Sequence, residues 1–509
     1  MLIPLVLSAY THLWNPIGFP VFHPDEGVYL RRSMHVLAGL GPQDPDSRFD
    51  HSQESTSSYD HPYFGQMLLG GIFALIGYPD SKDLAHSNSI EYYFSVPRVV
   101  MGIFSIIDTF LIFRICERRY NLTIAVAAAI LFAIMPMSWL TRRIVLDSLQ
   151  LPFVLLSILL LIEIGHRTKN TLLLCVFSGV CMGLSIFTKI PAIMLIPLGL
   201  YLILGTLHQH SKNSKLKFIA IWLLPTILIP TIWPAYALLN GQFDDWAKGV
   251  VWEGTQRHAE GKSLSDTLIN FLEADPVLFI LGLAAIGFCT IRRDFLPIIW
   301  IIPYFVLLSL VGWVTHFHLI LVLPPFCIAI AKLIEGIPRL LKLKQSVLVT
   351  TVVLAALTIF GLVITTMLIT TDISWTQLQA ARAVENFTTQ INKEGARQND
   401  NVTIIASPIY SWLFKYVFDN PYTFSHLRDT RQIGTAKVVL IVDMVYNTII
   451  SGSEGENKSQ VDRLQNIYNN TDVLALFKSD WSDKRNVYPY SGMDAAGIRS
   501  RTAEIRANY

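Results

Sequence analysis

Long apolar runs follow one another along most of the chain. A membrane-spanning helix needs about 20 mostly apolar residues. Runs close to that length cover 98–114, 122–140, 148–165, 171–188, 190–207, 217–238, 276–291, 295–313, 319–336 and 346–369. A shorter run over 1–22 has neither a basic start nor a small-residue cleavage site, so it indicates a first span and not a signal peptide. The pattern predicts a mainly α, polytopic membrane protein with about eleven transmembrane helices.

Clusters of lysine and arginine occupy every second loop between these runs. They are Arg114/Arg118/Arg119, Arg167/Lys169, Lys212/Lys215/Lys217, Arg292/Arg293 and Arg339/Lys342/Lys344. Cytoplasmic loops carry an excess of Lys and Arg, so we expect the intervening segments to face outward. The outward segments are then 23–97, 141–147, the vicinity of Lys189, 239–275, 314–318 and the tail 370–509.

The long first outer loop, 23–97, contains two segments that favour short helices at the membrane surface. The apolar run 62–78 is predicted not to span, because a crossing there would place Asp25 and Arg143 on opposite sides. In the other segment, 27–40, apolar residues recur at helical spacing opposite Arg31, Arg32 and His35. This pattern predicts an amphipathic interfacial helix with a cationic face. Its arginines serve either as a surface anchor or as phosphate contacts.

The tail 370–509 is more polar and alternates strand and helix patterns. Strands are predicted over Val402–Ser407 and Lys437–Asp443, and helices over Ser374–Lys393, Pro408–Phe418 and Ser459–Asn469. The alternation predicts a small α/β domain after a membrane module at 1–369. Sequons at Asn386, Asn401, Asn457 and Asn469 would accept glycans only if this side is lumenal or extracellular.

Composition agrees with a membrane protein and excludes other classes. Hydrophobic residues make up 52% of the chain and charged residues 15%, whereas soluble domains carry about 25% charge. A net charge of +2 excludes a strongly basic nucleic-acid binder. The spacing of the five cysteines fits neither a zinc motif nor a disulfide framework. The simplest interpretation is that they are small apolar side chains packed within the helix bundle.

Polar residues gather at the outward ends of the predicted spans, where burying charge is costly. The first cluster, His23-Pro24-Asp25-Glu26, directly follows the first apolar run. Two adjacent carboxylates there could supply a general base and a hydroxyl or metal ligand. An acid-rich helix N-terminus explains the same pair equally well.

The second cluster is Tyr59-Asp60-His61-Pro62, just before the run 62–78. A histidine at this depth could contact a phosphate or shuttle a proton. The alternative is an aspartate that caps a helix with proline in its first turn.

The third cluster, Arg142-Arg143 with Asp147, departs from the positive-inside trend. Arginine suits bidentate recognition of phosphate, whereas a local Arg143–Asp147 pair at i,i+4 is the plain alternative. Lys189 is a further outward cation that either contacts a phosphate or extends its ammonium group to the interface.

Taken in chain order, these motifs resemble those of the membrane GT-C glycosyltransferases. The resemblance is to the protein O-mannosyltransferase and aminoarabinose lipid A transferase group, over about residues 1–340. It rests on Asp25-Glu26, Tyr59-Asp60-His61-Pro62, Pro97-Arg98 and Arg143 with Asp147. The sequence departs from the pattern at Tyr63, where a second proline is usual, and at Val28, where some relatives carry arginine.

The resemblance implies an inverting transfer of a sugar from a dolichyl- or undecaprenyl-phosphate donor to a protein, glycan or lipid acceptor. Asp25 would be the catalytic base with Glu26 beside it. His61, Arg143 and Lys189 would meet the donor phosphate. Asp60 and Asp147, like Glu26, would orient the acceptor or hold a divalent cation such as Mg²⁺ or Mn²⁺. The protein would lie in the cell membrane or, in a eukaryote, in the endoplasmic reticulum.

Other classes remain open on the sequence alone. A secondary transporter also has many spans, but its site usually lies at the bilayer midplane between internal repeats, whereas the charge here gathers at one interface. A catalytic oligosaccharyltransferase subunit would carry Trp-Trp-Asp in its soluble domain, and no tryptophan of the tail is doubled. A non-catalytic assembly or flippase-like membrane protein is the third alternative.

Overall fold

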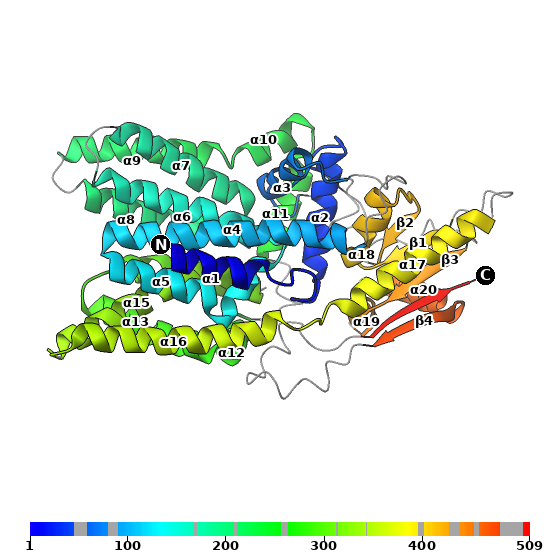
Figure 1. Cartoon of the computed structure of the whole chain (residues 1–509). Helices are drawn as coiled ribbons and strands as arrows, with labels where there is room; N and C mark the ends of the chain where they lie inside the picture. Colours follow the sequence, from blue (N-terminus) through cyan, green and yellow to red (C-terminus); the bar gives the residue numbers. More distant parts are fainter. Residues whose placement is uncertain are drawn as a thin grey trace.

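The computed structural model describes most of the chain. The described residues are 1–44, 59–79, 90–166, 170–207, 211–255, 263–311, 314–342, 344–394, 402–426, 437–451, 458–478 and 502–508. Figure 1 shows a bundle of long, roughly parallel and antiparallel helices with a smaller part made of strands and helices at one end.

Each segment that was predicted to span the membrane contains at least one helix. The bundle helices are α1 (Leu2–Leu13), α4 (Ile90–Arg119), α5 (Leu122–Ile134), α6 (Leu146–Ile164), α7 (Thr171–Thr188), α8 (Ile196–Thr206), α9 (Lys212–Leu228), α13 (Pro276–Ile291), α14 (Leu296–Val311), α15 (Leu323–Leu340) and α16 (Ser346–Ile369). Shorter pieces join them, namely η2 (Pro136–Arg142), η3 (Ile190–Leu195), α10 (Ile232–Leu239), α12 (Leu264–Ala274) and η5 (His316–Val322).

Within the described residues, five helices are long and apolar enough to cross a membrane. Up to eight crossings arise if each of three bent helix pairs is one span, and shorter apolar helices such as α1 and α14 lie beside them. The mainly α membrane fold predicted from the apolar runs is confirmed.

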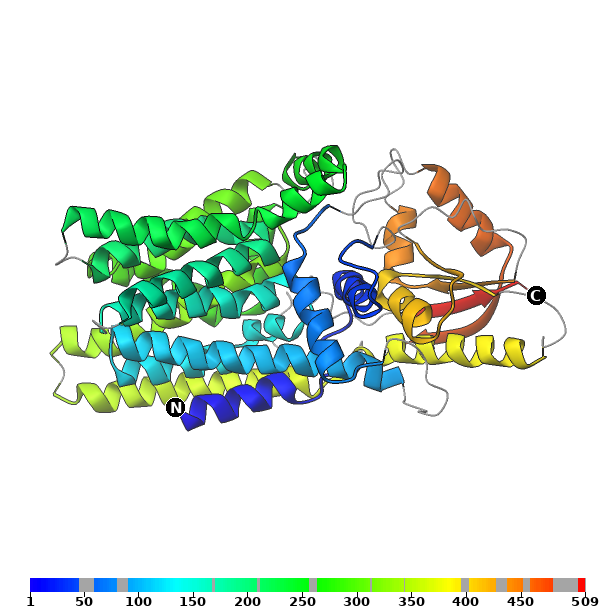
Figure 2. The ribbon, with the colours of Figure 1, turned by 90° about the horizontal axis from the view of Figure 1, so that it is seen from above.

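The two ends of the bundle differ in their chemistry. At one end, Arg118 Nε lies 2.7 Å from Glu163, and Arg119 and Lys332 both pair with Asp294. The opposite end carries α2 (Pro24–Leu37), α3 (Phe64–Leu75) and α11 (Phe243–Thr255), which lie toward the sheet (Figures 1 and 2). The first of these, the basic end of the bundle, therefore carries Arg118 and Arg119 of one predicted cluster, whereas Arg167 and Lys169 of another lie outside the described residues.

Helix α2 does not present the predicted cationic face. Arg31 Nε donates to Asp44 Oδ2 at 2.9 Å, and an Arg32 Nη donates to Asp60 Oδ2 at 2.7 Å. Both arginine side chains are only 2% exposed. The prediction was wrong because the chain after α2 folds back and brings a carboxylate to each guanidinium.

The C-terminal α/β domain contains a five-stranded sheet among the described residues. Its strands are β1 (Thr403–Ala406), β2 (Thr423–Ser425), β3 (Val438–Val442), β4 (Asp472–Lys478) and β5 (Thr502–Ala507). The order is β2-β1-β3-β5-β4, with β1 parallel to β2 and β3, and β5 antiparallel to both neighbours. Helix α17 (Trp375–Glu394) covers one face, and α19 (Met444–Ser451) and α20 (Lys458–Asn469) cover the other (Figure 2).

The tail predictions are confirmed where they were made. Both predicted strands and the helices at α17 and α20 form within a residue or two of the expected ends, and the third predicted helix forms α18 (Pro408–Trp412) and the π turn η6 (Leu413–Val417). Asn386 and Asn469 are exposed on α17 and α20, whereas Asn401 and Asn457 lie outside the described residues. All five cysteines are buried and unpaired.

The domain packs directly on α2. A Cβ added at Gly27 would lie 1.9 Å from the carbonyl oxygen of Pro408, the first residue of α18. Gln377 of α17 accepts a hydrogen bond from Phe22 N at 2.8 Å and donates one to Phe22 O at 2.9 Å. The chain around the Asp25-Glu26 pair is therefore held between the bundle and the α/β domain.

Candidate functional site

A cavity of about 240 Å³ lies at the end of the bundle that carries α2. Its lining comes from α2, the 59–63 turn, the start of α6, η3, α11, the end of α14, and η5. The polar lining residues are Asp25, Tyr29, Asp60, His61, Asp147, Lys189, Glu253, Thr315 and His318. Apolar side chains, among them Val145, Ile190, Leu307 and Val311, complete the wall. The cavity thus joins titratable groups to an apolar surface.

Asp25 projects from the first turn of α2. His23 caps this helix, because its ring accepts a hydrogen bond from Asp25 N at 3.3 Å. His23 Nδ1 also lies 3.5 Å from Asp25 Oδ1, and the Asp25 side chain is 27% exposed. Pro24 at the first helical position favours the same start. The local sequence therefore fixes where the Asp25 carboxylate meets the cavity.

Lys189 and Asp147 form the charged pair of the cavity. Lys189 Nζ lies 2.6 Å from Asp147 Oδ2 and 3.4 Å from His318 Nε2. Thr315 N donates to His318 Nδ1 at 3.1 Å, which orients the ring. Asp147 Oδ1 is buried and has no hydrogen-bond partner among the described residues. The pair leaves one carboxylate oxygen for a further donor.

His61 is held by its own turn. Its Nδ1 donates to the carbonyl oxygen of Asp60 at 2.6 Å, and its backbone N–H donates to Asp60 Oδ1 at 2.9 Å. Burial lowers the pKa of His61 to about 4, so the ring is neutral near pH 7. A neutral imidazole that donates through Nδ1 carries a lone pair on Nε2. In this state Nε2 can accept a hydrogen bond from a hydroxyl, and it must gain a proton before it can donate to a phosphate oxygen.

Glu26 and Arg143 pair with each other and do not line the cavity. Glu26 is 1% exposed and accepts from Arg98 at 2.9 Å and from Arg143 at 3.0 Å. The N–H groups of His23 and Ile144 also donate to this carboxylate. Burial alone would raise the pKa of Glu26, but the two guanidinium groups outweigh burial and lower it. The alternative local pair of Arg143 with Asp147 does not form, because each has a distant partner.

Asp60 and Asp147, for which a divalent cation was one predicted partner, are already paired with cations of the protein. Among the described residues, no three His, Cys, Asp or Glu side chains are arranged to hold one. Asp60 is bound by Arg32, and Asp147 by Lys189. Because these cations already neutralise the carboxylates, we assign no metal ligand here.

Sequence reasoning missed some of the lining. Glu253 Oε1 of α11 lies 3.9 Å from His61 Nδ1, and the Tyr29 ring stacks on the His61 ring with centroids 6.0 Å apart. Neither residue stands in a recognisable motif. The one available signal for Glu253 was its place in the outward loop 239–275.

Comparisons with known proteins agree with this architecture. Over nearly its whole length, the chain superposes on ArnT from Cupriavidus metallidurans bound to undecaprenyl phosphate. The TM-score is 0.57 at 11% identity, with 99% of this chain and 96% of ArnT covered. The oligosaccharyltransferase AglB from Archaeoglobus fulgidus, in complex with an inhibitory peptide and a dolichol-phosphate, gives a TM-score of 0.56 at 13% identity. Here 96% of this chain and 69% of AglB are covered.

The fold defines the class: this is an integral membrane protein with the GT-C fold of ArnT. The family model that matches is that of the dolichyl-phosphate-mannose-protein mannosyltransferases, over residues 47–243. No curated protein sequence matches the chain. The resemblance inferred from the ordered motifs is thus confirmed.

Proposed function

We propose that this protein is an inverting glycosyltransferase that moves a sugar from a polyprenyl-phosphate donor to an acceptor on the extracytoplasmic side of the membrane. The observation that carries the proposal is the cavity itself. It joins a partly exposed carboxylate, Asp25, to a cation, Lys189, beside an apolar wall. The family match and the similar structures, which hold undecaprenyl phosphate and dolichol-phosphate, support a reaction of this general kind.

Asp25 is the proposed catalytic base. It takes the proton from an acceptor hydroxyl or amine as the acceptor atom attacks the anomeric carbon. The bond between that carbon and the phosphate oxygen breaks, and the polyprenyl phosphate leaves with the electron pair. Attack opposite to the leaving group inverts the anomeric configuration.

Lys189 is the proposed contact for the donor phosphate. A fixed ammonium group in a partly dry cavity stabilises the charge that develops on the leaving phosphate. Asp147 holds Lys189 at 2.6 Å and so positions it before the donor arrives. His61 joins this contact once the bound phosphate has raised its proton affinity, and before that its Nε2 accepts from a hydroxyl.

The isoprenoid chain is proposed to follow the apolar wall. Leu307 and Val311 lie near the end of α14, and Ile190 lies at the start of η3. These residues would give the isoprenoid an apolar surface beside the polar lining, so that the donor need not leave the membrane to react.

Other residues in and beside the cavity are proposed to position the reacting groups. Glu26 and Arg143, with Arg98, tie the first turn of α2 to α4 and to the segment between η2 and α6. Asp60 and Glu253 line the cavity and would orient a protein, glycan or lipid acceptor.

The test is donor consumption by the purified protein reconstituted in vesicles. Mannosyl-, glucosyl- and aminosugar-bearing polyprenyl phosphates are supplied with a membrane extract as the acceptor source, and mass spectrometry follows the lipid and the products. Asp25→Asn keeps the shape and should lower the rate by about 10²- to 10⁴-fold. Asp244→Asn, an exposed carboxylate on α11, is the matched control. No consumption of any donor by the wild type, or full activity of Asp25→Asn, would contradict the proposal.

A further inference from the structure

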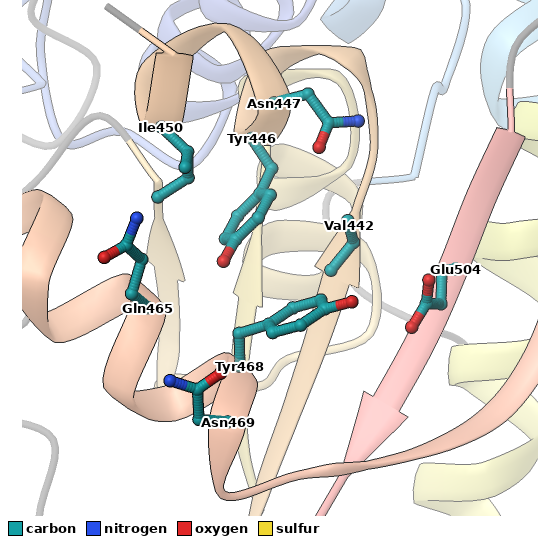
Figure 3. Close-up of a pocket in the computed structure, with 8 residues that line it drawn as sticks. All are labelled: Val442, Tyr446, Asn447, Ile450, Gln465, Tyr468, Asn469 and Glu504. Atoms are coloured by element: carbon teal, nitrogen blue, oxygen red, sulfur yellow. The ribbon is translucent and has the colours of Figure 1, made fainter. Parts of the chain in front are cut away.

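A second pocket, of about 430 Å³, lies in the α/β domain, separate from the bundle cavity. Figure 3 shows it between α19, α20 and strand β5. Its lining residues are Val442, Tyr446, Asn447, Ile450, Gln465, Tyr468, Asn469 and Glu504. This volume falls within the range of roughly 300–1,000 Å³ that is usual for small-molecule sites.

The register of the sheet explains why the pocket forms here. Val442 pairs directly with Glu504 across β3 and β5, so both side chains project from the same face. Val438, Leu440 and Val442 on that face pack with Tyr446 and Leu464, the core beneath α19 and α20. Glu504 stands where this apolar core ends, and it places a carboxylate at the edge of the pocket.

Two tyrosine rings form the floor. In Figure 3 the ring of Tyr446 from α19 lies beside that of Tyr468 from α20, with centroids 6.0 Å apart and planes 24° apart. Arg506 holds Tyr468 from the sheet side, with its guanidinium carbon 4.0 Å from the ring centroid. Tyr446 is only 4% exposed and its hydroxyl donates to Leu464 O at 3.4 Å, so it supports the wall from beneath. The partly buried Tyr468 supplies the aromatic contact surface and a polar hydroxyl edge.

Three side-chain amides surround this floor. Those of Asn447, Gln465 and Asn469 form no hydrogen bond with another described residue. Each amide offers two donors and an acceptor, so together they can match several hydroxyls at once. Arg506 is paired with Glu504, and no lysine or arginine is among the described residues that line the pocket.

This chemistry suits a neutral ligand rich in hydroxyl groups and disfavours an anion. A pyranose ring has an apolar C–H face that packs on an aromatic ring, and a rim of hydroxyls that both donate and accept. A phosphate or carboxylate would instead meet Glu504 with no free cation opposite. We infer that the α/β domain carries a saccharide-binding site formed by Tyr446, Tyr468, Asn447, Gln465 and Glu504.

The inference does not depend on Asp25 or on the transfer reaction. An N-glycan attached at Asn469, which stands in a sequon, would reach the same pocket. The test therefore uses full-length protein made in a host without N-glycosylation and carrying Asp25→Asn, so that turnover does not interfere.

Binding is measured by saturation-transfer difference NMR with methyl α-mannopyranoside, methyl β-glucopyranoside and chitobiose as probes. At least one probe should bind, and Asn447→Ala combined with Gln465→Ala should weaken it about tenfold or more, because two hydrogen bonds are lost. Asn466→Ala, an exposed amide on α20 outside the pocket, should bind as before. Binding of none of the probes, or equal binding by the double variant, would overturn the inference. Displacement of the saccharide by inorganic phosphate would also overturn it.

Discussion

Lys189 Nζ lies 2.6 Å from Asp147 Oδ2, although 42 positions separate the two residues in the chain. The pair unites the start of α6 with the start of η3 at the edge of the cavity. A donor phosphate that enters the cavity there would bind the Lys189 ammonium group, to which the Asp147 carboxylate also binds. The pair is therefore the most direct place to test how the donor is bound.

Lys189→Gln should raise the donor KM about 10- to 150-fold, the equivalent of one charge-assisted hydrogen bond worth about 1.5–3 kcal/mol. Asp147→Asn should not raise it, because the amide oxygen still accepts from Lys189 and keeps it in place while the negative charge that competes with the phosphate is removed. Initial rates over a range of donor concentrations measure both effects. Lys332→Gln breaks an ion pair at the opposite end of the bundle and serves as the control. A normal donor KM for Lys189→Gln would place the phosphate elsewhere.

Glu26→Gln should destabilise the protein, whereas Asp25→Asn should not. Glu26 is a buried partner of both Arg98 and Arg143, and removal of one member of a buried ion pair costs about 3–5 kcal/mol. Asp25 is partly exposed and should affect the rate alone. Thermal unfolding of the purified variants, followed by intrinsic fluorescence, separates the two effects. An unchanged Tm for Glu26→Gln would show that the network does not hold α2.

Acid should destabilise the fold through two buried histidines. Burial lowers the pKa of both His61 and His426 to about 4. The unfolded chain, with a histidine pKa of about 6.5, binds protons that the folded chain does not, so stability falls as pH drops below about 6.5. Each residue should cost about 2 kcal/mol at pH 5 relative to pH 7.5.

The measurement is the difference in denaturation midpoint between pH 7.5 and pH 5. The difference should shrink for His426→Gln, which lies in the α/β domain away from the proposed chemistry. His35→Gln is the control, because His35 is only partly buried on α2. If His426→Gln and the wild type lose the same amount of stability between pH 7.5 and pH 5, His426 does not titrate in this way.

Much of the architecture follows from local sequence patterns. The long apolar runs predict the bundle helices, and the apolar stretch at Val438–Val442 predicts a strand. Asp25 and Lys189 could be singled out from the sequence because charged residues are costly beside a membrane span and are kept there for a partner or a function. Other features depend on contacts between distant residues. Glu26 and Arg143 pair across 117 positions, and no spacing signals such a partner. Strand β5 forms only when the end of the chain returns antiparallel between β3 and β4.

Gly27→Ala should disturb both stability and transfer. Its Cβ would lie 1.9 Å from the Pro408 carbonyl oxygen, so α2 must move away from α18. Overpacking of this kind costs about 1–3 kcal/mol, and the shift moves Asp25 on the same helix. Gly71→Ala on α3, where a Cβ meets nothing within 4 Å, should leave both properties intact. Transfer rate and Tm measure the outcome, and a wild-type rate in Gly27→Ala would show that the contact does not position Asp25.

The orientation of the protein can be tested with single cysteines, because all five natural cysteines are buried. Asn386→Cys places an exposed thiol on α17 of the α/β domain, and Arg292→Cys places one at the basic end of the bundle. A membrane-impermeant maleimide applied to intact cells or right-side-out vesicles should label Asn386→Cys at once. Arg292→Cys should react only after permeabilisation, since basic loops stay in the cytoplasm. The reverse pattern would place the cavity and the α/β domain inside and would overturn an extracytoplasmic site for the reaction.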